Sequence, residues 1–214
     1  MSYIQFRDVS KSFGGNAVLK AVSFGIEKGG VYGFVGRNGS GKTVIFKLMT
    51  GLMIPDSGEI TIGGENFNAK GKFPDSAGVM IETPGFIPHY SGLKNLKILN
   101  TMSVNPVPAA EIAALMTRLG LDPKNRRPAR TYSLGMRQKL GIIQAVMNKP
   151  ELLVLDEPMN SLDDSSVKLV RELFTELNGG GTTIVLASHI AEDIESLCTK
   201  KFRIDNASVT EVTA

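Results

Sequence analysis

The 214-residue sequence predicts an α/β fold built on a mainly parallel sheet, and two observations support this prediction. The segments 152–155 (LLVL) and 183–187 (TIVLA) are apolar almost throughout, as strands are when helices cover both faces of a parallel sheet. Between them, apolar residues recur at helical spacing from 167 to 177, and the glycines 179–181 follow. Strand, helix and strand in this order form a βαβ unit, whose strands run parallel.

The composition narrows the class of protein. A hydrophobic fraction of 42% and a charged fraction of 21% are those of an ordinary soluble globular protein. The net charge of +3 is small and the basic stretch 124–130 holds no aromatic residue, so we expect a solvated loop there and no nucleic-acid partner. The single cysteine, Cys198, excludes an internal disulfide. The apolar runs are strand-sized, below the ~18 residues of a membrane span, so a partner would have to cross any membrane.

The N-terminal third indicates more strands. Short half-buried strands are expected at 3–6 and 21–26, and the apolar segment 31–35 (VYGFV) is expected to be the first parallel strand. A further strand at 59–62 is followed by the glycine pair 63–64, which is typical of a tight turn. We therefore expect an N-terminal antiparallel β-layer beside the parallel sheet.

The middle of the chain differs in character. Helical periods occur at 93–99, 111–119 and 134–147, and prolines separate them. The sequence thus predicts a single domain over residues 1–214, with a helical subdomain inserted at approximately 86–149.

A glycine-rich segment between a predicted strand and a predicted helix fits the pattern G-x-x-x-x-G-K-[ST]. In such a loop, backbone N–H groups surround phosphate oxygens at the positive end of the following helix. Lys42 would reach the β- and γ-phosphates, and the Thr43 hydroxyl would bind Mg²⁺. A chance glycine-rich turn would not need this strand–loop–helix context. The sequence therefore predicts a P-loop NTPase (RecA-like) core, with the loop residues Gly36, Arg37, Asn38, Gly39, Ser40, Gly41, Lys42 and Thr43.

Two carboxylates directly follow the apolar strand 152–155. Asp156 is placed to hold Mg²⁺ through water, and Glu157 to act as general base on the attacking water. Alternatively, Asp-Glu-Pro simply ends a strand and begins a turn. The glycine loop favours the catalytic interpretation.

Further segments occur in the order typical of one family. From about residue 3 to residue 205, the sequence resembles the nucleotide-binding subunit of an ABC (ATP-binding cassette) transporter. The resemblance implies that Phe13 stacks on adenine, although Phe13 could instead belong to the core. Glu82 stands where the family usually has a glutamine that contacts Mg²⁺ and the attacking water, so it is assigned both metal-binding and catalytic roles.

Three other segments match the family. Residues 132–136 (YSLGM) stand where the family has LSGGQ, and the resemblance implies that Ser133 and Gly135 contact nucleotide bound to the opposite subunit. Residues 160–163 (NSLD) resemble the dimer-contacting loop, and His189 matches the switch histidine that contacts the γ-phosphate. Alternatively, Ser133 is an N-cap and His189 a structural residue.

This sequence departs from the family at two places. Leu134 and Met136 replace a glycine and the glutamine of LSGGQ, while the serine, the backbone N–H groups and the helix N-terminus are kept. Glu82 adds a negative charge near the metal, which could strengthen metal binding or raise its own pKa. Both features resemble the bacterial exporters of peptide antibiotics such as bacitracin and lantibiotics.

The resemblance implies an ATPase that uses ATP and Mg²⁺. Two subunits, in a homodimer or in a heterodimer with a similar ATPase, would sandwich two ATP molecules, and a transmembrane permease would follow their opening. The chain would then lie in the cytoplasm, on the inner face of the cell membrane. The alternatives are a soluble ABC ATPase that serves a regulatory or assembly complex, and a binding module without hydrolysis.

One apolar segment follows Glu82 in a predicted loop. The resemblance places this region beside the groove that receives a helix of the membrane subunit, so Phe86, Ile87 and Tyr90 are candidates for that contact. The alternative is a buried hinge between two lobes.

Overall fold

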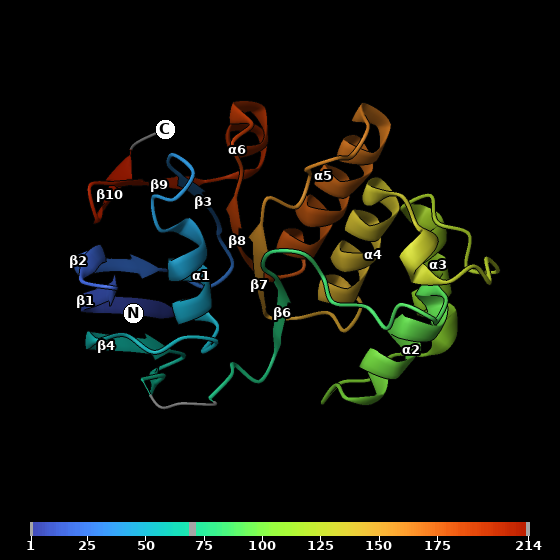
Figure 1. Cartoon of the computed structure of the whole chain (residues 1–214), viewed down its shortest axis with the longest axis horizontal. Helices are drawn as coiled ribbons and strands as arrows, with labels where there is room; N and C mark the ends of the chain where they lie inside the picture. The colour runs from blue at the N-terminus through green and yellow to red at the C-terminus, as the bar shows by residue number, and fades with distance from the viewer. Residues whose placement is uncertain (1, 69–71, 213–214) are drawn as a thin grey trace.

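The computed structural model describes residues 2–68 and 72–212, and its centre is a mainly parallel sheet (Figure 1). The strand order is β10-β9-β3-β8-β7-β6, and only β10 runs antiparallel to its neighbour. The predicted α/β class and parallel sheet are therefore confirmed. The six strands are β3 (Val31–Val35), β6 (Ala77–Met80), β7 (Leu152–Asp156), β8 (Thr183–Ala187), β9 (Lys200–Asp205) and β10 (Ser208–Val212).

The central strands are apolar throughout because each face of the sheet meets a separate core. Leu153 and Leu155 of β7 pack in the core on the side of the long helices. Leu152 and Val154 point the other way, into the core beneath α1 (Lys42–Met49) and the second sheet. Alternate residues of a strand point to opposite faces, so both sets have to be hydrophobic.

The expected antiparallel layer is a four-stranded sheet of order β2-β1-β4-β5. Its first hairpin is longer than the sequence suggests, because β2 begins at Asn16 rather than at Ala21. Gly14 and Gly15, with φ of 54° and 83°, form the two-residue turn that pairs Phe13 with Asn16. The pairing shifts register along the hairpin, which hides the alternating pattern. The strands are β1 (Ile4–Phe13), β2 (Asn16–Ile26), β4 (Ser57–Ile62) and β5 (Glu65–Asn66).

The remaining helices lie on the opposite side of the parallel sheet or at its end (Figure 1). In that view α5 and α4 follow the sheet, α2 and α3 lie outermost, and α6 lies at the upper edge of the sheet. We call α2, α3 and α4 the helical lobe and the rest the core lobe. The helices are α2 (Gly92–Thr101), α3 (Ala109–Arg118), α4 (Leu134–Val146), α5 (Asp164–Gly179) and α6 (Ala191–Leu197), with a 3₁₀ turn at Ala129–Thr131.

Cys198 follows α6 and packs against the centre of β3. A Cβ added at Gly33 would lie 2.8 Å from the Cys198 Sγ, so glycine is required for this close approach. Burial raises the pKa of the Cys198 thiol to about 12. In the described part of the chain, no helix combines the length and the apolar character that a membrane crossing demands.

Candidate functional site

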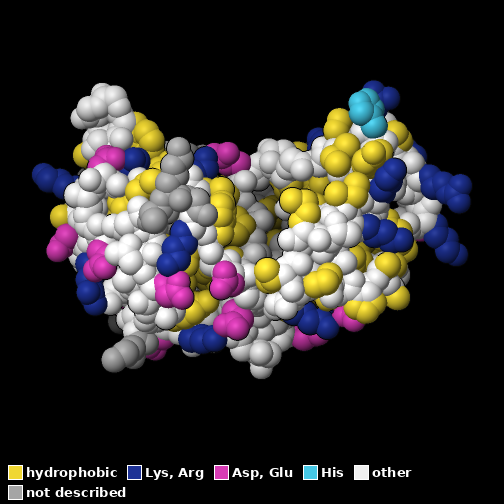
Figure 2. Space-filling view, turned by 90° about the horizontal axis from the view of Figure 1, so that it is seen from below, with side chains coloured by type: hydrophobic (Ala, Val, Ile, Leu, Met, Phe, Trp, Pro, Cys, Tyr) yellow, Lys and Arg dark blue, Asp and Glu magenta, His cyan; other side chains and the backbone are white. Residues whose placement is uncertain are grey.

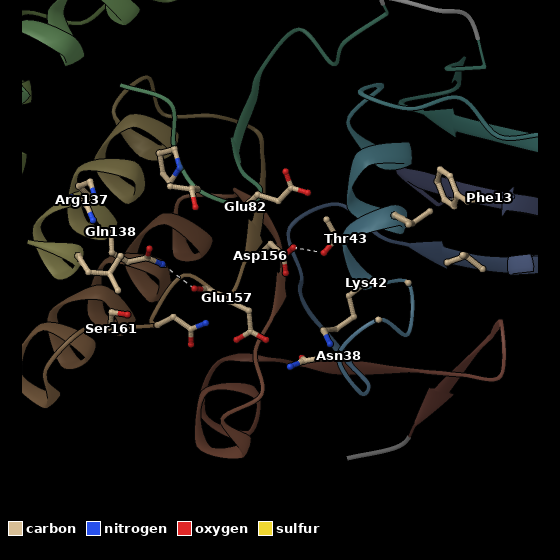
Figure 3. Close-up of a pocket in the computed structure, with 18 residues that line it drawn as sticks. Phe13, Asn38, Lys42, Thr43, Glu82, Arg137, Gln138, Asp156, Glu157 and Ser161 are labelled. Atoms are coloured by element: carbon tan, nitrogen blue, oxygen red, sulfur yellow. Dashed lines mark hydrogen bonds between the residues drawn. The ribbon is translucent and has the colours of Figure 1, made fainter. Parts of the chain in front are cut away.

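A cleft of about 580 Å³ lies between the core lobe and the helical lobe (Figure 3). Its walls come from the first hairpin, the glycine loop, the segment after β6, the segment after β7 and the start of α4. Nine residues that the sequence analysis assigned to nucleotide binding, metal binding or catalysis line it together: Phe13, Asn38, Gly39, Gly41, Lys42, Thr43, Glu82, Asp156 and Glu157.

The backbone conformation of the glycine loop favours glycine over residues with side chains. Gly39 and Gly41 have φ of 79° and 111°, in the left-handed region that glycine enters without cost. At Gly36 a Cβ would lie 2.7 Å from the Ile204 carbonyl oxygen. Helix α1 begins directly after Gly41, so its free N–H groups and positive dipole end lie at the loop. This arrangement suits an anion such as a phosphate.

Lys42 holds its ammonium group inside the loop. The residue is only 8% exposed, and its Nζ donates hydrogen bonds of 2.7 Å to the Gly36 carbonyl and 3.2 Å to the Arg37 carbonyl. The Ser40 Oγ is buried and has no hydrogen-bond partner among the described residues. A ligand with several acceptor oxygens fits this set of donors, because buried polar groups are normally satisfied.

Thr43 and Asp156 offer oxygen ligands of the kind that Mg²⁺ prefers. The Thr43 Oγ1 donates a 2.6 Å hydrogen bond to the Asp156 Oδ2 at the end of β7. The described residues contain no group of three or more His, Cys, Asp or Glu side chains that could hold a metal by themselves. Mg²⁺ commonly takes one or two protein ligands and completes its shell with phosphate oxygens and water, so this pair fits it.

Glu157 is positioned by contacts with His189. The Glu157 Oε2 lies 2.8 Å from the His189 Nδ1 and accepts a 3.2 Å hydrogen bond from the His189 backbone N–H. Glu157 and Glu82 both have positive φ, 52° and 60°, which is strained for a non-glycine residue. The Glu82 carboxylate accepts a 2.6 Å hydrogen bond from the Lys47 Nζ and stays largely exposed. Backbone strain such as the positive φ of Glu157 and Glu82 concentrates at functional sites.

Comparison with known proteins identifies the family. The ABC transporter family profile matches residues 19–160, more than half of the chain. The chain belongs to the ABC transporter family. An uncharacterised ABC transporter ATP-binding protein of Bacillus subtilis (strain 168) is 38% identical over 195 residues, which cover 91% of this chain and 89% of the relative. As an ABC ATP-binding subunit, the chain is an ATPase.

Two further relatives carry names that describe a transported class. The lantibiotic transport ATP-binding protein SrtF of Streptococcus pyogenes is 36% identical, over 91% of this chain and 83% of the relative. The bacitracin transport ATP-binding protein BcrA of Enterococcus faecalis is also 36% identical, over 91% of this chain and 63% of the relative. The resemblance to the ATP-binding proteins of bacitracin and lantibiotic transport is therefore confirmed.

Solved ABC cassettes share the fold. A dimeric cassette in a post-hydrolysis state, bound to ADP and Pi, superposes with a TM-score of 0.88 at 20% identity, over 98% of both chains. An ATP-binding subunit of an ABC transporter gives 0.86 at 24% identity, over 99% of this chain and 90% of that one. The P-loop NTPase core is thereby confirmed.

The segment that stands for the ABC signature touches the cleft only through Leu134. Ser133 and Gly135 do not line it, and Ser133 caps α4 by accepting a 3.2 Å hydrogen bond from the Met136 N–H. Ser133 therefore acts as the N-cap of α4, which was the structural alternative for this residue. Gly135 faces the segment after β7, since a Cβ there would lie 2.9 Å from the Ser161 carbonyl oxygen.

Sequence reasoning missed some residues of the ABC cleft. Gln138 is the most informative, because its Nε2 donates 2.9 Å hydrogen bonds to the carbonyl oxygens of Glu157 and Pro158. It thereby ties α4 to the backbone that carries Glu157. The available signal was its position one turn after Leu134, which places both residues on one face of the helix. Other lining residues outside the predicted set are Val18, Val44, Thr83, Pro84 and Arg137, while Asn160 and Ser161 come from the segment 160–163 that resembles the dimer-contacting loop.

The apolar turn after Glu82 is held by one amide. Asn95 is 2% exposed, accepts a 2.7 Å hydrogen bond from the Ile87 N–H and donates to the Tyr90 carbonyl at 3.3 Å. Ile87 is 43% exposed, while Phe86 and Tyr90 are half-buried. Because the three side chains are not all buried, this turn is available for contact with another protein.

Proposed function

We propose that the chain binds ATP with Mg²⁺ in this cleft, hydrolyses it with Glu157 as general base, and acts in a dimer to drive a permease. The observation that carries the proposal is the placement of Glu157. Its carboxylate lies in the same cleft as Lys42 and the Thr43–Asp156 pair, and it is held by His189, which does not itself line the cleft. A base, a cation and a metal-binding pair are the parts that phosphoryl transfer to water needs.

Each residue has a distinct role in this proposal. The N–H groups of the glycine loop and the Lys42 ammonium bind the β- and γ-phosphates. Thr43 and Asp156 hold Mg²⁺, which neutralises charge on the phosphates. Glu157 accepts a proton from the attacking water, and His189 orients Glu157 and contacts the γ-phosphate. Glu82 lines the cleft at the glutamine position of the family, where it would contact the metal and the attacking water. Phe13, which is 46% exposed at the cleft, stacks on adenine.

The site is incomplete in one subunit. Ser133 and Gly135 lie outside the cleft, at the N-terminus of α4, where free N–H groups suit a phosphate. In our proposal, a second subunit places its own α4 N-terminus over the γ-phosphate, in a homodimer or in a heterodimer with a similar ATPase. ATP thus holds two subunits together, and hydrolysis lets them open.

The permease is proposed to bind the face that Figure 2 shows, which is hollowed between the two lobes and carries apolar side chains at the hollow. A groove of about 400 Å³ between β6 and the end of α2 supports this choice. Three large apolar side chains on it, Phe73, Met102 and Val104, are 52%, 78% and 72% exposed. Exposed apolar surface of this kind marks protein contacts. The turn at Phe86 and Ile87 would contribute as well.

The relatives support a proposal for the transported class and for the location. Because proteins named for bacitracin and lantibiotic transport are 36% identical, we propose that the permease exports a peptide antibiotic or drug. The chain would then act in the cytoplasm, attached to the inner face of the membrane through that permease. We also propose that residues 86–149 form one helical subdomain that moves as a unit within a single domain.

The test of the mechanism is Glu157→Gln, which keeps the size of the side chain and removes its basicity. ATPase activity should fall by about 10²- to 10⁴-fold, the usual contribution of a general base. ATP binding should be retained, and the variant should accumulate as a dimer with ATP on size-exclusion chromatography. Hydrolysis at the wild-type rate would show that Glu157 is not the base.

A further inference from the structure

A buried carboxylate joins α5 to α6. Asp193 is fully buried, and both of its oxygens are used. Its Oδ1 accepts hydrogen bonds of 3.1 Å and 2.6 Å from the Nε and Nη2 of Arg171 in α5. Its Oδ2 accepts a 2.8 Å hydrogen bond from the Ser188 hydroxyl. Burying a carboxylate is costly unless it is paired and fully hydrogen-bonded, as it is here.

This network reaches the backbone on both sides of His189. Ser188 precedes it and donates to Asp193, and the Ser188 Oγ in turn accepts a 3.1 Å hydrogen bond from the Ile190 N–H. The His189 side chain itself is 60% exposed, so little packing fixes its position. Its contacts with Glu157 depend on where residues 188–190 hold the backbone.

We propose that Asp193, oriented by Arg171, is a positioning residue for ATP hydrolysis. It holds Ser188, and through Ser188 the backbone of Ile190, so that His189 reaches Glu157. Asp193 does not line the cleft, so it acts through His189 rather than on ATP. The inference rests on the roles proposed above for His189 and Glu157.

The arrangement requires a carboxylate. An asparagine at position 193 would fit the same space, but its NH₂ group would either face the N–H donors of Arg171 or reverse the hydrogen bond with the Ser188 hydroxyl. The charge that the bidentate guanidinium needs would also be lost. Glutamate 192 offers a matched comparison, because the same Arg171 donates a 2.7 Å hydrogen bond to Glu192, whose side chain is 74% exposed. Exposed ion pairs contribute little to stability, so Glu192→Gln removes a bond of Arg171 at small cost.

The first experiment compares Asp193→Asn with Glu192→Gln in the full chain. For Asp193→Asn we expect kcat to fall roughly 10- to 100-fold, since small displacements of catalytic groups have effects of this size. The Kd for ATP should stay within about twofold, because this residue does not touch the nucleotide site. Glu192→Gln should leave kcat and Kd unchanged. An unchanged kcat in Asp193→Asn would overturn the proposal.

A double-mutant cycle with His189→Ala separates positioning from general destabilisation. If Asp193 acts through His189, Asp193→Asn should lower the single-turnover rate of His189→Ala no further. A fall by the same factor in both backgrounds would show that Asp193 acts on hydrolysis by another route. Ser188→Ala is the variant to use if Asp193→Asn does not fold, because it keeps the ion pair and removes only the link to the loop. Its free energy of unfolding should fall, because the buried Asp193 Oδ2 loses its partner. Its kcat should fall in protein that is still folded, and an unchanged kcat would refute the link.

A spectroscopic measurement completes the test. The chain has two histidines, so the ring resonances of His189 can be followed with His89 as an internal control. Asp193→Asn should move the His189 resonances and leave those of His89 in place, and Glu192→Gln should move neither. Unmoved His189 resonances in Asp193→Asn would contradict the proposed positioning.

Discussion

The hydroxyl of Thr43 donates a 2.6 Å hydrogen bond to the carboxylate of Asp156, and so joins the start of α1 to the end of β7. The two residues are 113 positions apart in the sequence. Their oxygens point at one place in the cleft, beside the loop that suits phosphates (Figure 3).

This pair predicts the Mg²⁺ dependence of ATP hydrolysis. Asp156→Asn keeps an acceptor for Thr43 but removes the charge, so the Mg²⁺ concentration for half-maximal ATPase activity should rise about 10- to 100-fold, as for other residues that support a metal ligand. Thr43→Ser keeps the hydroxyl and is the control. Identical Mg²⁺ titration curves for Asp156→Asn and the wild type would contradict the assigned metal site.

Phe13 predicts a separable effect on nucleotide affinity. It is 46% exposed, so Phe13→Ala should change the free energy of unfolding by less than about 0.5 kcal/mol. Loss of stacking should cost about 1 kcal/mol or more, which raises the Kd for ATP at least about fivefold. Phe13→Tyr keeps the ring and should bind as the wild type does. Equilibrium binding of a fluorescent ATP analogue measures all three, and equal affinities would rule out stacking.

Gln138 predicts a stability effect with a control on the same helix. Gln138→Leu removes two hydrogen bonds to the carbonyls of Glu157 and Pro158, so the free energy of unfolding should fall by about 1–3 kcal/mol. The Oε1 of Gln144, also on α4, is buried without a hydrogen-bond partner among the described residues. Gln144→Leu should therefore be neutral or stabilising. Urea unfolding measures both, and equal losses in the two variants would contradict the assigned role of Gln138.

The raised pKa of Cys198 predicts how the stability of the protein changes at high pH. Its pKa is raised by burial from 9.0 to about 12, so the unfolded thiol ionises above about pH 9 while the folded thiol remains protonated. Unfolding then releases a proton, and stability should fall as pH rises from about 9 to about 12. Cys198→Ala should remove this part of the pH dependence in urea unfolding curves. Parallel curves for both proteins would show that the thiol titrates normally when folded.

The sequence predicts best those elements whose local pattern has one explanation. The strands 31–35 and 183–187 were expected with their observed bounds, because both-face burial demands continuous apolar runs. Helix α6 and strands β9 and β10 were not expected. Helix α6 has only seven residues, and β9 (KKFRID) mixes charged residues with a single buried face. Local patterns of this strength are easily overridden by tertiary contacts.

The candidate site also combines residues that the sequence predicts with residues that it does not. The glycine loop and the Asp156-Glu157 pair are local patterns that carry their own chemistry, so they could be found without a structure. The roles of Gln138 and Asp193 could not be found in this way. The spacing from Leu134 places Gln138 on a helix face, but its partner Glu157 lies 19 positions away, and Arg171 lies 22 positions from Asp193. A residue that works by holding another backbone segment leaves no spacing rule in the sequence.

The parallel sheet is shared between two cores, since β7 places Leu153 and Leu155 on one side and Leu152 and Val154 on the other. Neither core can open without exposing the apolar residues of the same strands. The slowest-exchanging amide hydrogens should therefore be those of β7 and β8, and they should exchange only when the whole chain unfolds. Even if the two lobes move relative to one another as proposed, the chain should melt in one cooperative transition, and neither half would be stable if expressed alone.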